Sequence, residues 1–137
     1  MRLGIVGSRG YTNRERIKSI VERYIAQYGS GNLIIVSGGC PKGADFLGKQ
    51  VALELDLPYE EHAPRHAKYN QYCVQSPDSY NKPYNVGHYF ERNAEIAEGS
   101  DHILAFTIKG LKCNGTMDTV TKARKLGKQV FIFEDES

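Results

Sequence analysis

The sequence predicts a single Rossmann-like α/β domain in which helices cover both faces of a mostly parallel, five-stranded, doubly wound sheet. Short apolar runs rich in β-branched residues alternate with helical patterns, and glycine-containing loops follow several of these runs. The length of 137 residues suits one well-filled core and is short for two domains. The whole range 1–137 is therefore expected to fold as one unit.

Four apolar runs have the character of parallel strands. They are 3–6, 33–36, 103–106 and 130–133, and none shows the polar alternation of a half-exposed strand. We expect them to be covered on both faces. A shorter run, 57–61, predicts a further strand between the second and the third of these.

Four helical segments separate the predicted strands. In 17–28, apolar residues recur at steps of three and four, with Asn13 placed to cap the start and Gly29 to end the helix. Similar patterns predict helices over 44–55, 87–97 and 116–126. In a doubly wound sheet, ligands bind beyond the carboxyl ends of the strands, so the loops after the strands are the expected site.

The tyrosine-rich segment 62–86 interrupts this rhythm, because it is too long for a simple connection. It holds Tyr69, Tyr72, Tyr80 and Tyr84 among prolines, asparagines and serines. Two interpretations stay open at this point. The segment is either a solvated insertion packed by its own tyrosines or a lid that stacks aromatic rings on a bound base.

Composition argues against several classes of function. A formal net charge of +2 falls well short of the basic surface expected of a nucleic-acid-binding protein. Three well-separated cysteines favour a reducing, cytoplasmic setting over a disulfide framework or a zinc site. No apolar run approaches the roughly 18 residues that span a bilayer, so a soluble, unexported protein with no membrane partner is expected. No metal or resident cofactor is predicted.

Three loops that follow predicted strands carry the candidate ligand-binding residues. Glycine lets the backbone approach a ligand closely, and the free N–H groups that begin a helix bind anions. The second loop is no P-loop, because Lys and Ser/Thr do not follow its last glycine, and the first loop lacks the middle glycine of the dinucleotide fingerprint. The candidates are Gly7, Ser8 and Arg9; Ser37, Gly38, Gly39, Gly43, Ala44 and Asp45; and Asn114, Gly115 and Thr116.

Ordinary roles also fit these residues. Any one of the loops alone is commonly a tight turn. Thr116 is placed to cap the helix that it begins, and Asp45 complements the dipole of the helix in whose first turn it lies. All three loops nevertheless follow parallel strands, and the fold brings them to the same rim of the sheet. A shared ligand explains this convergence better than three independent turns do.

The motifs G-S-R, S-G-G-x-x-x-G-A-D, E-R-N and N-G-T, in that order, resemble the SLOG superfamily of Rossmann-like domains, with the YspA/YpsA-like branch nearest. The resemblance covers nearly the whole chain outside the insertion. It implies a nucleotide-derived ligand, such as a signalling nucleotide or an NAD-related metabolite. It assigns Arg92 and Asn93 of the E-R-N motif to the ligand site, with the arginine directed to a phosphate or ribose, and it implies a homodimer or higher homo-oligomer.

The superfamily also includes the DNA-processing protein A family and the LOG phosphoribohydrolases. In the LOG hydrolases, an E-R-K motif and a later P-G-G-x-G-T-x-x-E motif serve cleavage of an N-glycosidic bond. Here the segment 109–115 departs from the second motif, and the position of its glutamate falls on Thr119, which is no carboxylate base. Asp118 is a candidate catalytic substitute, although adjacent residues on a helix point about 100° apart.

These observations lead to one predicted function and one alternative. We predict a module that binds a nucleotide or nucleotide-derived phosphorylated ligand, for sensing or sequestration, without catalysis. The alternative is a nucleotide-processing enzyme, such as a LOG-like nucleoside 5'-monophosphate phosphoribohydrolase that uses Asp118 or Asp45.

Overall fold

A computed structural model describes residues 1–136 and contains one parallel five-stranded sheet in the order β3-β2-β1-β4-β5. The predicted α/β fold is confirmed. The chain runs outward from β1 to β3 and then returns to lay β4 on the other side of β1, so the order reverses between β1 and β4. The strands are β1 (Arg2–Gly7), β2 (Ile34–Ser37), β3 (Tyr59–Glu61), β4 (His102–Ile108) and β5 (Gln129–Asp135).

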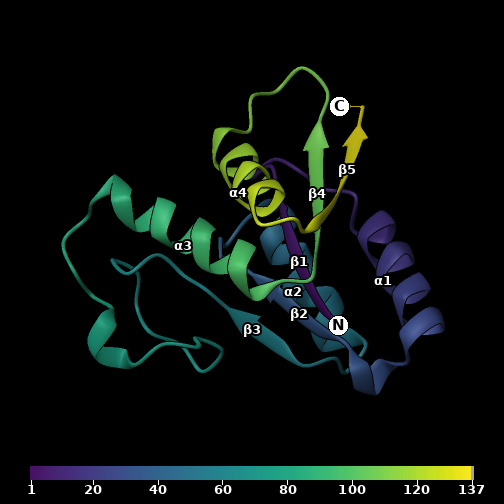
Figure 1. Cartoon of the computed structure of the whole chain (residues 1–137), viewed down its shortest axis with the longest axis horizontal. Helices are drawn as coiled ribbons and strands as arrows, with labels where there is room; N and C mark the ends of the chain where they lie inside the picture. Colours follow the sequence, from purple (N-terminus) through teal and green to yellow (C-terminus); the bar gives the residue numbers. More distant parts are fainter. Residues whose placement is uncertain (137) are drawn as a thin grey trace.

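Four helices cover the two faces of the sheet (Figure 1). Alternate residues of β4 point to opposite faces of the sheet and show which helices cover each face. Leu104 and Phe106 pack with the first pair of helices, and Ile103 and Ala105 pack with the second pair. The first pair is α1 (Arg14–Tyr28) and α2 (Gly43–Glu54), and the second pair is α3 (Val86–Gly99) and α4 (Asn114–Lys125). Short 3₁₀ turns, η1 (Ser30–Asn32) and η2 (Pro77–Ser79), complete the elements.

Helix ends follow from local capping. Asn13 caps α1, where its side chain accepts from the backbone N–H of Arg16 at 3.2 Å, and Gly29 ends the helix at φ +86°. Helix α3 begins one residue before its predicted start, because the Asn85 side chain accepts from the N–H of Gly87 at 2.8 Å. Helix α4 begins at Asn114, two residues earlier than predicted, so Thr116 lies within the first turn.

The expectation that the strand at 130–133 is covered on both faces is wrong. Strand β5 forms one edge of the sheet, and Phe131 and Ile132 are each 42% exposed. The two helix pairs reach Val130 and Phe133 of this strand and leave the two residues between them open. An apolar run does not reveal whether a strand lies in the centre or at the edge of a sheet.

The insertion has an organised interior of its own. Ala63, Cys73 and Tyr80 form a small buried cluster, and the ring of Tyr69 lies 6.2 Å from that of Tyr80. A single parallel bridge joins Glu61 at the end of β3 to Cys73. The insertion is thus packed partly by its own tyrosines, and Figure 1 shows it extending beyond β3 beside α3.

Candidate functional site

The three glycine-containing loops line one cavity of about 1180 Å³ at the carboxyl ends of the strands. Most of the residues predicted to bind a ligand lie on its wall. They are Gly7, Ser8, Arg9, Gly39, Asp45, Arg92, Asn93, Asn114, Gly115 and Thr116. Ser37, Gly38, Gly43 and Ala44 are not among the lining residues, and they belong to the framework behind the cavity.

Two of the predicted glycines allow the first two loops to pack together. Gly43 has φ +72°, and a Cβ atom at this position would lie 2.2 Å from the carbonyl oxygen of Ser8. A Cβ atom on Gly7 would lie 2.7 Å from the Cβ atom of Ala44 and 2.1 Å from the carbonyl oxygen of Phe106 on β4. The Ser8 carbonyl also accepts from the N–H of Ala44 at 3.2 Å. These glycines therefore serve close backbone contacts in addition to any ligand.

The second loop surrounds a buried carboxylate. Asp45, at the start of α2, accepts from the N–H of Cys40 at 3.4 Å. Burial raises the pKa of Asp45 to about 6, although the nearby Arg92 charge and the Cys40 N–H act to lower the pKa. Ser37 is also buried, and its hydroxyl donates to the backbone carbonyl of Asp45 at 3.4 Å.

The E-R-N motif connects the loops across the cavity. Arg92 on α3 donates from Nη1 to the Gly38 carbonyl at 2.6 Å and from Nε to the Asn93 side chain at 3.0 Å. Asn93 is buried and donates to the Gly115 carbonyl at 3.3 Å. Helix α3 thereby holds the second loop and the third loop in a fixed relation.

The start of α4 has no side-chain cap. Its N-cap residue is Cys113, whose side chain makes no capping hydrogen bond, and its first turn holds no acidic residue. Thr116 and Thr119 are buried in the helix but still contribute to the wall of the cavity. The Thr119 hydroxyl donates to the Gly115 carbonyl at 3.3 Å. This helix start therefore presents unsatisfied N–H groups at the cavity.

Asp118 has a different environment. Its carboxylate accepts from the Asn93 amide at 3.1 Å and forms an ion pair with Lys122 one turn later on α4. Asp118 is absent from the lining of the cavity, whereas Thr119 is present. Its carboxylate therefore links α3 to α4 from behind the third loop.

Positive charge dominates the cavity wall. Arg9, Lys42, Arg92 and Lys112 line it, and Asp45 is the one carboxylate among the lining residues within 1–136. Arg9, Lys42 and Lys112 are exposed, and none of them forms an ion pair with any described residue. The candidate residues from the sequence included neither Lys42 nor Lys112, because an isolated lysine in a loop carries no distinguishing signal.

Part of the cavity wall is aromatic. His66 and Tyr84 from the insertion and Tyr89 and Phe90 from α3 line the cavity there. Of the four insertion tyrosines noted in the sequence, Tyr84 reaches this wall. The other three residues of the wall gave no periodic or motif signal.

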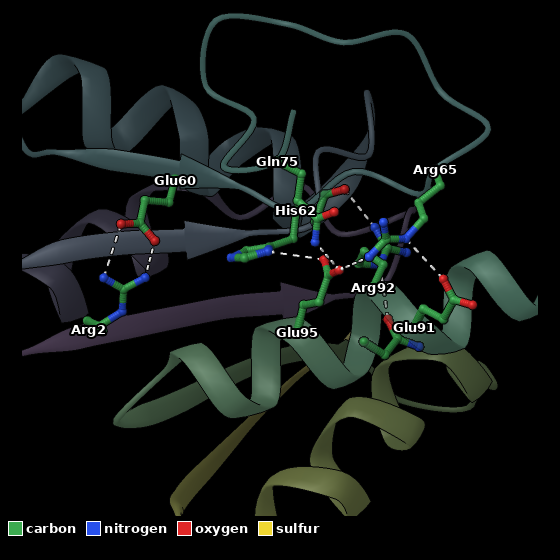
Figure 2. Close-up of polar contacts among 10 residues, drawn as sticks. Arg2, Glu60, His62, Arg65, Gln75, Glu91, Arg92 and Glu95 are labelled. Atoms are coloured by element: carbon green, nitrogen blue, oxygen red, sulfur yellow. Dashed lines mark hydrogen bonds and ion pairs between the residues drawn. The ribbon is translucent and has the colours of Figure 1, made fainter. Parts of the chain in front are cut away.

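A charge network fixes the insertion to α3 (Figure 2). Glu95 accepts from Arg65 at 2.8 Å, is hydrogen bonded to His62 Nδ1 at 3.2 Å and contacts the Gln75 amide, while Arg65 also pairs with Glu91 at 3.0 Å. Burial alone would raise the pKa of Glu95. The His62 contact and the Arg65 charge outweigh burial and hold that pKa below its ordinary value.

Among residues 1–136, no group of three or more His, Cys, Asp or Glu side chains is arranged to hold a metal ion. In the same part of the chain, every helix is too short or too polar to cross a membrane.

No protein-family model matches the chain, and no curated protein matches its sequence. Among solved structures, the chain is similar to the molybdenum cofactor binding protein from the phototrophic bacterium Rippkaea orientalis, with a TM-score of 0.67 and 21% sequence identity. The match covers 98% of this chain and 76% of that one. The likeness confirms a Rossmann-like fold.

Proposed function

We propose that the chain binds a phosphorylated, nucleotide-type ligand in the 1180 Å³ cavity and acts as a sensing or sequestering module. The observation that carries the proposal is the charge of the wall, where four cationic side chains face one carboxylate. A multiply charged anion would neutralise Arg9, Lys42 and Lys112, which form no ion pair with any described residue.

The start of α4 supports a phosphate at this position. The N–H groups of Asn114, Gly115 and Thr116 begin a twelve-residue helix that lacks a side-chain cap, and the positive end of the helix dipole lies on the same side. A phosphate there would accept from these N–H groups and from Lys112 on the preceding loop.

The sequence motifs support the same class of ligand. We propose that the chain is a SLOG-type domain nearest the YspA/YpsA-like branch, on the strength of the G-S-R, S-G-G-x-x-x-G-A-D, E-R-N and N-G-T motifs. The structural neighbour is described as binding the molybdenum cofactor, so that cofactor belongs in the panel of ligands to be tested.

Binding without catalysis fits the acidic residues better than hydrolysis does. Thr119, on the cavity wall, holds the place at which the LOG motif has its glutamate, and the Asp118 carboxylate is engaged by Asn93 and Lys122. Asp45 remains as a carboxylate on the wall, and it lies beside Arg92. A hydrolase would need a carboxylate free to act on the glycosidic bond.

Thermal-shift and calorimetric titrations test the proposal. The panel comprises nucleoside mono-, di- and triphosphates, NAD, inorganic pyrophosphate and the molybdenum cofactor. We expect at least one ligand to stabilise the protein. The double substitution Arg9→Ala, Lys112→Ala should weaken the affinity for that ligand about tenfold or more, because charged hydrogen bonds are lost. The double substitution Arg23→Ala, Lys125→Ala removes two exposed cationic side chains that do not line the cavity, and it is the charge-matched control. Failure of every ligand to bind the wild-type chain contradicts the proposal.

We also propose that two copies of the chain associate through β5. An exposed apolar edge strand is a ready template for pairing, and two-fold antiparallel pairing can set Phe131 opposite its own copy. Native mass spectrometry should show a dimer or higher oligomer that Phe131→Lys reduces to a monomer. Phe46→Lys, at a similarly exposed phenylalanine on α2, should leave the association unchanged. A monomeric wild-type protein refutes the pairing.

A further inference from the structure

Four aromatic side chains line the cavity, and the rings of three of them contact one another. We call His66, Tyr84, Tyr89 and Phe90 the aromatic wall. The ring of His66 lies 5.2 Å from that of Tyr84 and 5.1 Å from that of Tyr89, and the two tyrosine rings are 6.2 Å apart. These spacings are those of favourable aromatic pairs.

Much of this wall is open to solvent. Tyr84 is 70% exposed and Phe90 is 49% exposed, although both line the cavity. Exposed apolar area that gathers in a concave site marks a surface that a ligand buries. Tyr80 of the same insertion is 4% exposed, so the insertion buries one of its tyrosines and leaves another open at the cavity.

The wall is held in place before any ligand binds. Tyr89 OH lies 3.3 Å from Nε2 of His66, which joins α3 to the insertion within the wall itself. Behind it, the Glu95 network with His62 and Arg65 fixes the first residues of the insertion to the same helix (Figure 2). A pre-ordered surface loses little conformational entropy on binding, which favours affinity.

Arg92 joins the aromatic wall to the cationic side of the cavity. Its guanidinium carbon lies 5.6 Å from the centre of the Tyr89 ring, and its Nη1 donates to the Gly38 carbonyl. A ligand with a phosphate at the glycine loops would therefore extend past Arg92 toward Tyr89 and Tyr84.

We propose that the aromatic wall selects ligands that carry a planar nitrogen heterocycle and that Tyr84 stacks on this ring. This inference rests on the proposed binding of a phosphorylated ligand and adds the part of the ligand that gives specificity. The phosphate supplies attraction to Arg9, Lys42 and Lys112, and the ring supplies discrimination. Tyr84 is then a specificity-determining residue contributed by the insertion.

Comparing ligands with and without the ring tests the inference. Dissociation constants are measured for ADP, GDP, CDP and UDP and for inorganic pyrophosphate, which has the phosphates alone. The wild-type chain should bind at least one nucleotide about tenfold more tightly than pyrophosphate, as base–aromatic stacking provides. Tyr84→Ala should remove most of that preference and leave pyrophosphate affinity unchanged, whereas Tyr84→Phe should keep the preference. Tyr69→Ala, at an insertion tyrosine that does not line the cavity, is the control.

The failures of the two proposals are distinguishable. If pyrophosphate binds but no nucleotide is preferred, or if the preference survives Tyr84→Ala, the role of the aromatic wall is refuted while phosphate binding stands. If Tyr84→Ala weakens pyrophosphate and nucleotides equally, Tyr84 supports the cavity as a whole and the inference fails. If no ligand of either kind binds, the proposed function is refuted, and the inference with it.

Discussion

Arg92 Nη1 donates to the carbonyl oxygen of Gly38 at 2.6 Å, which ties α3 to the loop after β2 across the carboxyl end of the sheet. The two residues are 54 positions apart in the chain. A side chain at position 38 would meet this contact, because a Cβ atom there would lie 2.3 Å from that Nη1 atom. A larger residue at position 38 would thus displace the guanidinium that makes this contact.

Removing the guanidinium should destabilise the protein even without ligand. Arg92→Ala deprives the Gly38 carbonyl of a charged donor and Asp45 of its nearby positive charge, so we expect a loss of about 1–3 kcal/mol in the free energy of unfolding at pH 7. Urea denaturation measures this loss. The exposed Arg23→Ala should change it by less than about 0.5 kcal/mol. Equal stability of the two variants would show that the Arg92 contact carries no net energy.

The buried carboxylate of Asp45 should make stability depend on pH. Its pKa is raised by burial from 3.8 to about 6, so the folded chain binds this proton more tightly than the unfolded chain. The resulting stabilisation is complete below about pH 4 and is lost as the pH rises through 6. Asp45→Asn should therefore gain stability relative to wild type between pH 4 and pH 7, by up to about 3 kcal/mol.

Denaturation at several pH values from 4 to 7 measures this difference. Asp56→Asn removes a carboxylate from an exposed position, where asparagine tolerates the φ of +54°, and serves as the control. The idea fails if the difference between Asp45→Asn and wild type stays constant over this range or falls as the pH rises.

Gly43 should tolerate no side chain. It combines φ +72° with a Cβ position 2.2 Å from the Ser8 carbonyl oxygen and 2.5 Å from the Arg9 Cα atom, so alanine would push the first two loops apart. We expect Gly43→Ala to cost at least about 2 kcal/mol of unfolding free energy. Gly31→Ala, where no atom lies within 4 Å of the added Cβ, should be nearly neutral in the same urea titration. A neutral Gly43→Ala would show that the loops adjust freely.

The sequence was sufficient for the fold because its signals are local. Apolar runs and helical periodicity alternate along the chain. Asn13 caps the start of α1 and Gly29 ends it, as capping chemistry requires. The doubly wound topology then brings the three loops to one rim. Each step depends on neighbouring residues or on a general rule of chain connection, so no tertiary information was needed.

The parts of the site that escaped prediction depend on the path of the insertion. Tyr69 and Tyr84 have similar sequence surroundings, yet Tyr84 lines the cavity and Tyr69 packs near Tyr80. Tyr84 contacts the rings of His66 and Tyr89, while the Glu95 network holds the start of the insertion on α3. Most of these contacts join residues far apart in the chain, so they leave no local pattern. Gly43 was predicted as a ligand residue, but the structure gives it a packing role between loops that no motif reveals.

Loosening the Glu95 network should free the insertion from α3. Glu95→Gln removes the charge that His62 and Arg65 contact, so amide hydrogens over 62–85 should exchange faster, while those of α1 keep their wild-type rates. Burial acts against the ionised carboxylate, but the His62 and Arg65 contacts lower its pKa below the ordinary value of 4.5. The stabilisation from Glu95 is therefore present above about pH 4.5 and is lost as the pH falls, so the variant should approach wild type in acid.

Glu60→Gln provides the matched control for this measurement. Glu60 pairs with Arg2 at the opposite side of the view in Figure 2, and its side chain is about as exposed as that of Glu95, at 27% against 21%. The Glu60→Gln substitution removes a partly buried carboxylate from the edge strand β3 and leaves the contacts between the insertion and α3 in place. Hydrogen exchange followed by mass spectrometry should then show faster exchange over 62–85 in Glu95→Gln and not in Glu60→Gln. Identical exchange of the insertion in both variants would mean that its internal Tyr80 cluster, and not the network on α3, holds the aromatic wall in place.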